Sequence, residues 1–233
     1  MNLNVIHEDP HIIVCYKPAG VPTQTSKLGE QDMVSLLKNY LYKKQLEKKE
    51  PYVAVIHRLD QPVEGLLVFA KTPFAAKELS KGLQGAGFGK YYKAVLWGVP
   101  KEKSATLQDY LVKDGRTNTS RVCDSSEKDA KKAVLSYEVL ATGTDDDKDI
   151  SLVRVKLDTG RHHQIRVQMA NMGCPIWGDA KYNTASVQDR RIRQIALCAY
   201  KLEFVHPKTK KKMEFEIQPQ GEGFFLDKSP HIQ

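Results

Sequence analysis

Short runs of β-branched and aromatic residues predict a chain built mainly of strands. Such side chains fit a pleated, half-buried surface, so each run is typical of one strand. The runs span residues 12–16, 52–56, 66–70, 91–97, 134–140, 152–157, 202–205 and 213–217. The last two flank a basic segment and predict a hairpin. Residues 99–132 are polar and lysine-rich and give only weak strand signals.

Three segments carry the periodicity of helices. Residues 31–49 place apolar side chains three or four positions apart, with a lysine-rich opposite face. Pro73 opens a second segment, at a helix position where proline is tolerated. A third helix is predicted over residues 163–172, with Gly173 as its stop. Because helices fall between strands without strict alternation, the pattern favours an α+β fold with a mixed sheet.

The composition is that of an ordinary globular protein, with 233 residues, 41% hydrophobic and 27% charged. This length suits one large domain or two closely joined lobes. No segment rich in glycine, serine or proline divides it, so we expect a single domain over residues 1–233. The apolar runs are too short for a membrane span, and the first ten residues resemble no secretion signal. Four cysteines without a CxxC pair indicate a reduced, cytoplasmic protein.

The chain has 36 Lys and Arg residues against 28 Asp and Glu residues, a net charge of +8. This excess suggests a polyanionic partner but does not establish one. The lysines within residues 38–49 and 208–212 form either a steering field for such a partner or ordinary solvated surface.

Common nucleotide, metal and kinase motifs do not fit the sequence. The glycines at 85, 87 and 89 precede a lysine, but neither the Walker spacing nor the dinucleotide spacing is met. His162 and His163 are adjacent, so on a helix they would point about 100° apart rather than toward one metal ion. The His-Arg-x-Asp cluster at 57–60 lacks the other motifs of a kinase.

Three segments concentrate side chains suited to chemistry. Residues 57–60 lie between two predicted strands and expose charges in a loop, although a structural salt bridge is the alternative. Residues 158–166 end a strand and open a helix, which places Arg161 and Arg166 where a phosphate or carboxylate is stabilised. A basic helix cap is the alternative there. Residues 90–94 place two adjacent tyrosines between lysines, so on a strand one tyrosine faces the core and the other a groove, unless both serve packing alone.

In this order, the segments resemble the RluA-type RNA pseudouridine synthase family. The chain carries HRLD at residues 57–60, K-x-Y-x-A at 90–94, TGR-x-HQIR at 159–166 and G-x-PI-x-GD at 173–179. The resemblance covers nearly the whole chain. It implies a mixed, mainly antiparallel central sheet with flanking helices and a central basic cleft. It also implies that no cofactor or metal is needed, since the reaction is redox-neutral.

Members of this family isomerise uridine to pseudouridine, which implies the same reaction here, within structured ribosomal or transfer RNA. The resemblance therefore implies a role for each matching residue. The target base must leave the stack before side chains can reach it. Asp60 is then the catalytic carboxylate, which either attacks the nucleoside or removes a sugar proton. Arg166 pairs with Asp60, and Tyr92 stacks on the uracil. The residues expected to bind the RNA or the base are Arg58, Arg161, His163, Gln164 and Leu197.

Several positions depart from the family pattern, which affects the choice of RNA. They are Gln61, Val63, Glu64, His162 and Cys198. Of these, Glu64 is expected to add negative charge near the site. The catalytic motifs begin too early for an N-terminal RNA-binding domain of the S4 type, so selectivity is expected from loops of the catalytic domain or from a partner. We expect a monomer with RNA as its partner and no obligatory protein partner.

Two other functions are compatible with the same sequence. One is a non-catalytic RNA-binding or RNA-folding protein on this scaffold, which intact Asp60, Tyr92 and Arg166 argue against. The other is a nucleosidase or glycosylase, which would use the same carboxylate and aromatic residue but release free uracil.

Overall fold

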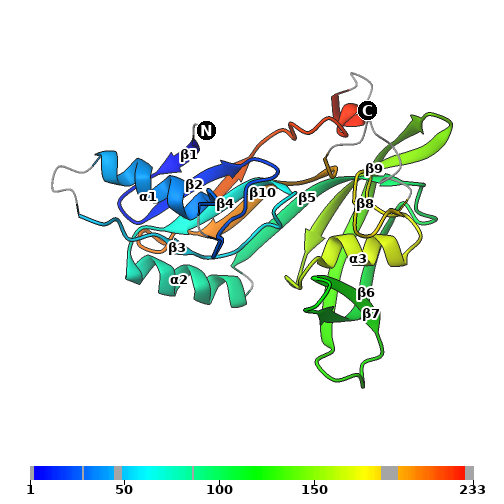
Figure 1. Cartoon of the computed structure of the whole chain (residues 1–233), viewed down its shortest axis with the longest axis horizontal. Helices are drawn as coiled ribbons and strands as arrows, with labels where there is room; N and C mark the ends of the chain where they lie inside the picture. Colours follow the sequence, from blue (N-terminus) through cyan, green and yellow to red (C-terminus); the bar gives the residue numbers. More distant parts are fainter. Residues whose placement is uncertain (1–2, 28, 45–48, 86, 185–193, 229–233) are drawn as a thin grey trace. The chain divides into compact units, whose positions relative to one another are not determined.

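The computed structural model describes residues 3–27, 29–44, 49–85, 87–184 and 194–228. The chain divides into two compact units. Unit 1 holds residues 1–89 and 199–218, and unit 2 holds residues 90–198 and 219–233. The chain passes from one unit to the other within β5 (Phe88–Trp97), again within β10 (Leu197–Val205) and once more after residue 218. Figure 1 labels β5 and β10.

The sheet of unit 1 has the strand order β1-β2-β4-β10, with β3 beside β4 and β11 beside β10. The pairs β1–β2, β2–β4, β3–β4 and β10–β11 are antiparallel. The strands are β1 (Asn4–Glu8), β2 (Ile12–Lys17), β3 (Ala54–Val55), β4 (Glu64–Ala70), β10 and β11 (Lys212–Glu216). The predicted hairpin and the strands β2 and β4 are confirmed, β3 is shorter than predicted, and β1 was not predicted.

Both faces of this sheet are covered, because every residue of β2 and β4 is buried. One face packs against α2 (Pro73–Gln84) through a cluster that includes Val14, Val68 and Leu79. Alternate residues such as Cys15 and Leu67 point to the opposite face and are also fully buried. The helix α1 (Met33–Lys44) buries the apolar stripe predicted for it, and the last part of the predicted helix, residues 45–48, lies outside the described residues.

The start of α2 is fixed by a capping threonine and the predicted proline. Thr72 Oγ1 accepts a hydrogen bond from the Ala75 N–H at 3.2 Å, and Pro73 occupies the first helical position. We expect Thr72→Ala to lower the free energy of unfolding by about 1 kcal/mol, because an N–H at the helix end loses its acceptor. Urea denaturation measures this. The exposed mid-helix variant Ser80→Ala serves as the control, and an equal loss in both variants would contradict the capping role.

Gly65, in β4, is required by space as well as by conformation. Its φ of +135° is unfavourable for other residues, and a Cβ atom there would lie 2.5 Å from the Ala199 carbonyl oxygen. Close approach of β10 to β4 in unit 1 therefore depends on this glycine.

Unit 2 contains an antiparallel array with the order β5-β9-β8-β6-β7. Its further strands are β6 (Ser104–Asp114), β7 (Thr119–Cys123), β8 (Lys131–Asp145) and β9 (Lys148–Leu157). The prediction of strands at β5, β8 and β9 is confirmed. The strands β6 and β7 occupy the segment whose signals were weak.

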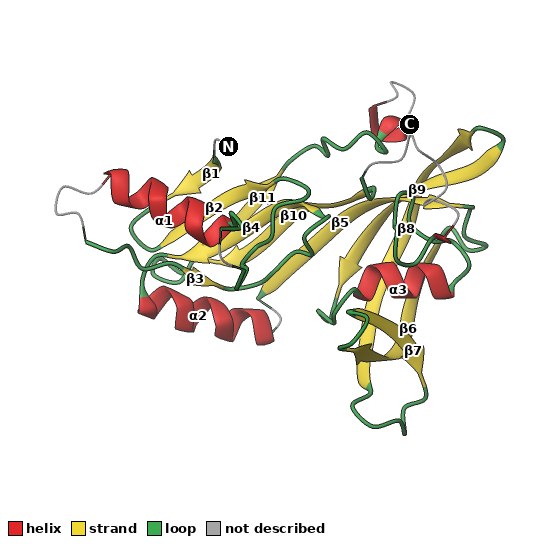
Figure 2. Ribbon diagram, in the orientation of Figure 1, coloured by secondary structure: helices red, strands yellow, loops and turns green. Residues whose placement is uncertain are grey.

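The described part of unit 2 includes two helices. The first, α3 (Gln164–Asn171), is labelled in Figure 2. It packs Val167 against Leu111 of β6 and Ala133 of β8, and Gly173 follows it with a φ of +86°. The predicted helix and its glycine stop are confirmed. The second, the 3-10 helix η2 (Phe225–Lys228), is held by an ion pair from Lys93 Nζ to Asp227 at 2.8 Å. Among the described residues, no helix is both long and apolar enough for a membrane crossing.

Candidate active site

Asp60 lies in unit 1 on the loop between β3 and β4, residues 56–63, which we name the Asp60 loop. Along this loop the exposed Arg58 and the half-buried Asp60 alternate with buried Leu59. The predicted arrangement, charged groups in a loop between buried strands, is therefore present. Leu59 anchors the loop while its charged neighbours remain accessible to a ligand.

The backbone on both sides of Asp60 is held by the segment that follows β2. Thr23 Oγ1 donates to the Leu59 carbonyl at 3.0 Å and accepts from the Leu59 N–H at 3.2 Å. The Gln61 carbonyl accepts from the Gly20 N–H at 2.8 Å. The Val63 N–H closes a turn onto the Asp60 carbonyl at 3.0 Å. Asp60 therefore extends from a backbone with few alternative conformations, which favours a defined carboxylate position.

Lys17 joins the same network from the end of β2 and is completely buried. Its ammonium donates to the carbonyls of Pro18, Val21 and Gln61 at 3.0, 2.7 and 3.0 Å. Burial lowers the pKa of Lys17 to about 7, although the charges of Asp60 and Glu64 oppose this shift. Lys17 was not among the predicted site residues. A lysine at the end of an otherwise apolar strand was the available signal.

Glu64 is buried as well, at 1% exposure, so the negative charge expected near the site lies in the interior. Its carboxylate accepts a hydrogen bond from the Tyr16 hydroxyl. Since Glu64 also acts electrostatically on Lys17, the two form an internal pair of opposite charges beneath the Asp60 loop.

Neutralising Glu64 tests whether this buried charge matters for stability. We expect Glu64→Gln to lower the free energy of unfolding by about 1–3 kcal/mol, because a hydrogen bond to a charged group weakens and Lys17 loses a counter-charge. Urea denaturation measures the change. Glu214→Gln, on β11, makes the same substitution at an exposed carboxylate and should change stability little. Equal stability of the two variants would contradict a structural role for the Glu64 charge.

Tyr92 lies in unit 2 on β5, opposite Val155 of β9, and is buried. Its neighbour Tyr91 is half-buried. The strand alternation therefore separates the two tyrosines as expected. Tyr92, which the family motif assigns to the uracil, is the more buried of the two, and its stacking role stays a prediction.

Arg166, on α3 in unit 2, makes a buried bidentate ion pair with Asp179. Its Nε and Nη2 atoms donate to the two carboxylate oxygens at 2.8 and 2.7 Å. The guanidinium also lies over the Tyr182 ring, 5.2 Å from the centroid. Asp179 belongs to the G-x-PI-x-GD stretch, but the sequence analysis did not include it among the site residues. The pairing of Arg166 with Asp60, which belongs to unit 1, stays a prediction.

His162 and His163 precede α3 as a stacked pair with ring centroids 3.8 Å apart. His163 adopts a left-handed φ of +53°, and its Nδ1 lies 2.8 Å from the Tyr182 hydroxyl. His162 Nδ1 lies 2.8 Å from the hydroxyl of Ser120 on β7. Burial, helped by the charge of Arg166, lowers the pKa of His163 to about 2, so this imidazole is neutral at physiological pH.

The other predicted RNA-binding residues of unit 2 differ in their exposure. Gln164 is buried, and its amide donates to the Val134 carbonyl at 3.1 Å and to the Gln168 side chain at 3.0 Å. Leu197 is buried at the start of β10. Arg161 is exposed and donates from Nε to the Lys132 carbonyl at 2.8 Å. Arg161 thus has direct access to solvent, and contact of all three with RNA stays a prediction.

Several lysines of the two basic segments pair with nearby carboxylates. Lys38 and Lys44 pair with Glu50 and Glu8 at 2.6 and 2.8 Å. In the turn between β10 and β11, Lys210 pairs with Glu78. Much of the lysine charge in these segments is therefore compensated locally, although such exposed pairs contribute little to stability.

Comparison with known proteins places the fold and the motifs in one family. Residues 11–171 match the family described as RNA pseudouridylate synthase. The chain belongs to the RNA pseudouridylate synthase family. One relative is the ribosomal large subunit pseudouridine synthase D of Pseudomonas aeruginosa. It is 34% identical to this chain, over 96% of this chain and 70% of that protein. The dual-specificity RNA pseudouridine synthase RluA of Vibrio parahaemolyticus is 31% identical, over 88% and 79% of the two chains. The RluA-type resemblance is confirmed.

The fold is that of a pseudouridine synthase domain. The human RNA pseudouridylate synthase domain containing 1 superposes with a TM-score of 0.77 at 23% identity, over 94% of this chain and 84% of that one. This confirms the predicted α+β class. The chain spans 65 to 66% of the length of the uncharacterised RNA pseudouridine synthases of Bacillus subtilis and Helicobacter pylori that it matches.

Proposed function

We propose that this chain is a catalytic domain that isomerises particular uridines to pseudouridine in structured ribosomal or transfer RNA. The observation that carries the proposal is the Asp60 loop, in which a half-buried carboxylate of the HRLD motif extends from a backbone fixed on both sides. Membership of the pseudouridylate synthase family supports the reaction. The names of the relatives from Pseudomonas and Vibrio support RNA as the substrate.

The reaction breaks the N1–C1′ bond of uridine, forms a C5–C1′ bond and moves the C5 proton to solvent while N1 gains one. Substrate and product are isomers, so atoms balance without a further reactant. A base paired in a helix is inaccessible, so the target uridine must be extruded first. Asp60 then either attacks the nucleoside covalently or removes a sugar proton. Both routes require an ionised carboxylate at a fixed position, which the hydrogen-bonded loop supports.

Arg166 and Tyr92 complete the proposed site from unit 2. Arg166 keeps Asp60 ionised and oriented, since a guanidinium stabilises the charged form of a carboxylate. The ion pair with Asp179 orients this guanidinium. Tyr92 stacks on the extruded uracil, and its hydroxyl assists removal of the C5 proton. Arg58, exposed two residues before Asp60, holds the RNA beside the extruded nucleotide.

Unmodified transcripts of ribosomal and transfer RNA provide the direct test. The purified protein is incubated with each, and pseudouridine is detected by carbodiimide modification and by mass spectrometry. We expect pseudouridine at a small number of positions. Binding without product would favour the non-catalytic RNA-binding alternative, and release of free uracil would favour the nucleosidase. Either result contradicts the proposed isomerisation.

A further inference from the structure

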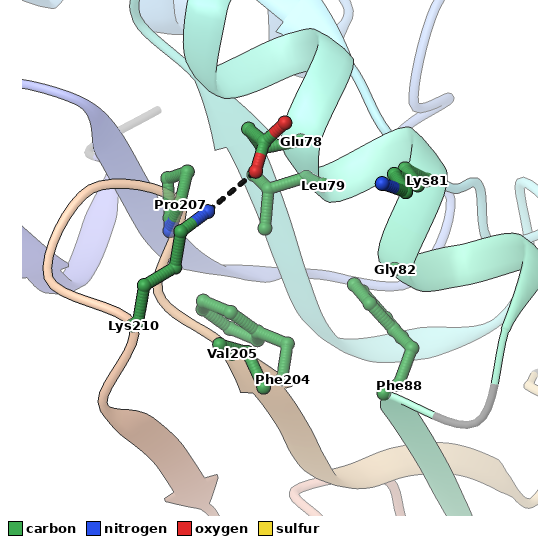
Figure 3. A pocket seen from close by; sticks show the side chains of 10 residues that line it. Glu78, Leu79, Lys81, Gly82, Phe88, Phe204, Val205, Pro207 and Lys210 are labelled. Atoms are coloured by element: carbon green, nitrogen blue, oxygen red, sulfur yellow. Dashed lines mark hydrogen bonds and ion pairs between the residues drawn. The ribbon is translucent and has the colours of Figure 1, made fainter.

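A pocket of about 270 Å³ lies in unit 1 between α2 and the turn that joins β10 to β11 (Figure 3). Leu79 of α2, Phe88 at the start of β5 and Phe204 of β10 form its apolar lining. Val205 and Pro207 extend this lining toward the turn. The volume is at the lower end of the range for small-ligand sites, which suits a single planar group rather than a larger ligand.

The half-buried Phe88 ring gives this pocket a partly exposed aromatic surface on which a planar group can stack, and the buried Phe204 ring supports it from within. Phe88 and Phe204 are stacked with centroids 5.7 Å apart and an interplanar angle of 22°. Behind them, Phe204 stacks on Phe215 of β11 at 5.9 Å and 26°. Such a series of parallel rings supports one wall, while Val205 remains 45% exposed at the opening.

The pocket is connected by direct contact to the Asp60 loop within the same unit. The His57 ring meets Phe88 edge-on, with centroids 5.4 Å apart. His57 Nε2 also accepts a hydrogen bond from the Val68 N–H at 3.3 Å, which fixes the ring against β4. His57 is the first residue of the HRLD motif and directly precedes Arg58. A polymer bound along the Asp60 loop therefore passes near the pocket.

Cationic side chains surround the opening. Lys81 of α2 and Lys210 of the turn lie at its edge, as Figure 3 shows, and Glu78 is the carboxylate that pairs with Lys210. Lys208 of the same turn lies over Phe74 at 6.0 Å. An apolar, aromatic interior with a net positive edge is complementary to a nucleotide, whose base is planar and whose phosphate is negative.

We propose that this pocket is a second binding site for the substrate RNA, which takes one unpaired nucleobase flanking the target uridine. The base stacks against Phe88 beneath Val205, and its phosphate is bound at Lys81. The proposal rests on the proposed function, because it assumes RNA as the polymer at the Asp60 loop. The turn between β10 and β11 then helps to select the RNA. Only an RNA with an unpaired base at the distance that separates the pocket from the Asp60 loop can fill both sites.

Two matched pairs of variants test the pocket without disturbing the core. Val205→Glu places a carboxylate at the opening, and Val99→Glu makes the same change at a valine of similar exposure in unit 2, 42%. Lys81→Glu reverses a charge at the edge, and Lys77→Glu reverses one a turn earlier on α2, outside the lining. The probe is a fluorescent short oligoadenylate, which cannot be isomerised and so reports binding alone. Ultraviolet cross-linking followed by mass spectrometry identifies the contacted peptides.

We expect Val205→Glu and Lys81→Glu to weaken binding by at least about fivefold relative to their controls, the size of one lost base stack. Wild-type protein should cross-link within residues 79–88 or 204–207. If all four variants bind the oligoadenylate equally and the cross-links lie outside these residues, the proposal is overturned. An acidic peptide is then the next occupant of the pocket to test. If wild type forms pseudouridine while Val205→Glu binds normally, the pocket fails and the proposed function stands. If Val205→Glu and Lys81→Glu weaken binding but wild type forms no pseudouridine in any transcript, the pocket stands as a binding site and the proposed function fails.

Discussion

Replacing Asp60 by asparagine is expected to reduce pseudouridine formation by at least about 10³-fold. Asparagine has nearly the same shape as aspartate, but it is neither a nucleophile nor a base under these conditions. The Asp60 loop is held through the backbone of its neighbours and through Thr23, so its conformation should survive the change. Single-turnover rates with a transcript that wild type modifies measure the effect.

Two controls distinguish lost chemistry from lost structure or binding. Asp147→Asn makes the same change at the exposed tip between β8 and β9 and should leave the rate unchanged. The Asp60→Asn protein should remain folded at the assay temperature and bind the transcript with similar affinity. Unchanged product formation by Asp60→Asn would remove this carboxylate from the mechanism.

Replacing Lys17 by methionine is expected to lower the free energy of unfolding by about 3–5 kcal/mol. The change removes hydrogen bonds to three carbonyls, including that of Gln61 in the Asp60 loop, and removes a positive charge that acts on the buried Glu64 carboxylate. Since the network supports Asp60, turnover should fall as well in protein that remains folded. Urea denaturation and single-turnover rates measure the two effects.

A double-mutant cycle with Glu64→Gln tests whether the two buried charges depend on each other. If they do, the double variant loses less stability than the sum of the single losses, by about 1 kcal/mol or more. Additive losses would show that Lys17 acts only through the carbonyls of Pro18, Val21 and Gln61.

The lowered pKa of Lys17 gives this variant a distinctive pH dependence. The unfolded chain holds the Lys17 proton up to the ordinary lysine value of 10.5, whereas the folded chain releases it near pH 7. Between these values the unfolded state binds more protons, so the free energy of unfolding of wild type rises with pH relative to Lys17→Met. Below pH 7 Lys17 is protonated in both the folded and the unfolded state, so the difference in the free energy of unfolding between wild type and Lys17→Met no longer changes with pH. Denaturation at pH 6, 8 and 10 measures this, and a constant difference would contradict the burial of a titrating lysine.

The sequence predicted the strands and helices whose apolar faces are buried. β2, β4 and α2 belong to this class, because their residues pack on a core and carry a strong periodicity. β6 and β7 gave weak signals because most of their side chains are exposed or half-buried, so their pairing depends on backbone hydrogen bonds that any residue can make. The same applies to β1 at the edge of unit 1. The sequence contained no feature that marks the division into two units.

For the candidate site, motif residues were easier to predict than the residues that support them. Asp60, Tyr92 and Arg166 stood in recognisable patterns. Lys17, Glu64 and Asp179 act by contacting groups distant in the sequence: Glu64 accepts from Tyr16, 48 positions earlier, and Asp179 binds Arg166, 13 positions earlier. Charged residues are most often exposed, so nothing in the pattern marked these three as buried. Only the packed structure shows that they are internal partners.

The hydrogen bonds around Tyr182 have a consequence for the tautomer of His163. The Tyr182 oxygen accepts from the Ser120 N–H at 2.8 Å and lies 2.8 Å from Nδ1 of His163, and we expect its hydroxyl hydrogen to be donated to that nitrogen. A neutral imidazole that accepts at Nδ1 carries its proton on Nε2. Since the pKa of this ring is near 2, nitrogen-15 spectra should show one fixed tautomer from pH 5 to pH 9. The residue that begins α3 is then a constant dipole with one oriented N–H, and it takes no part in proton exchange.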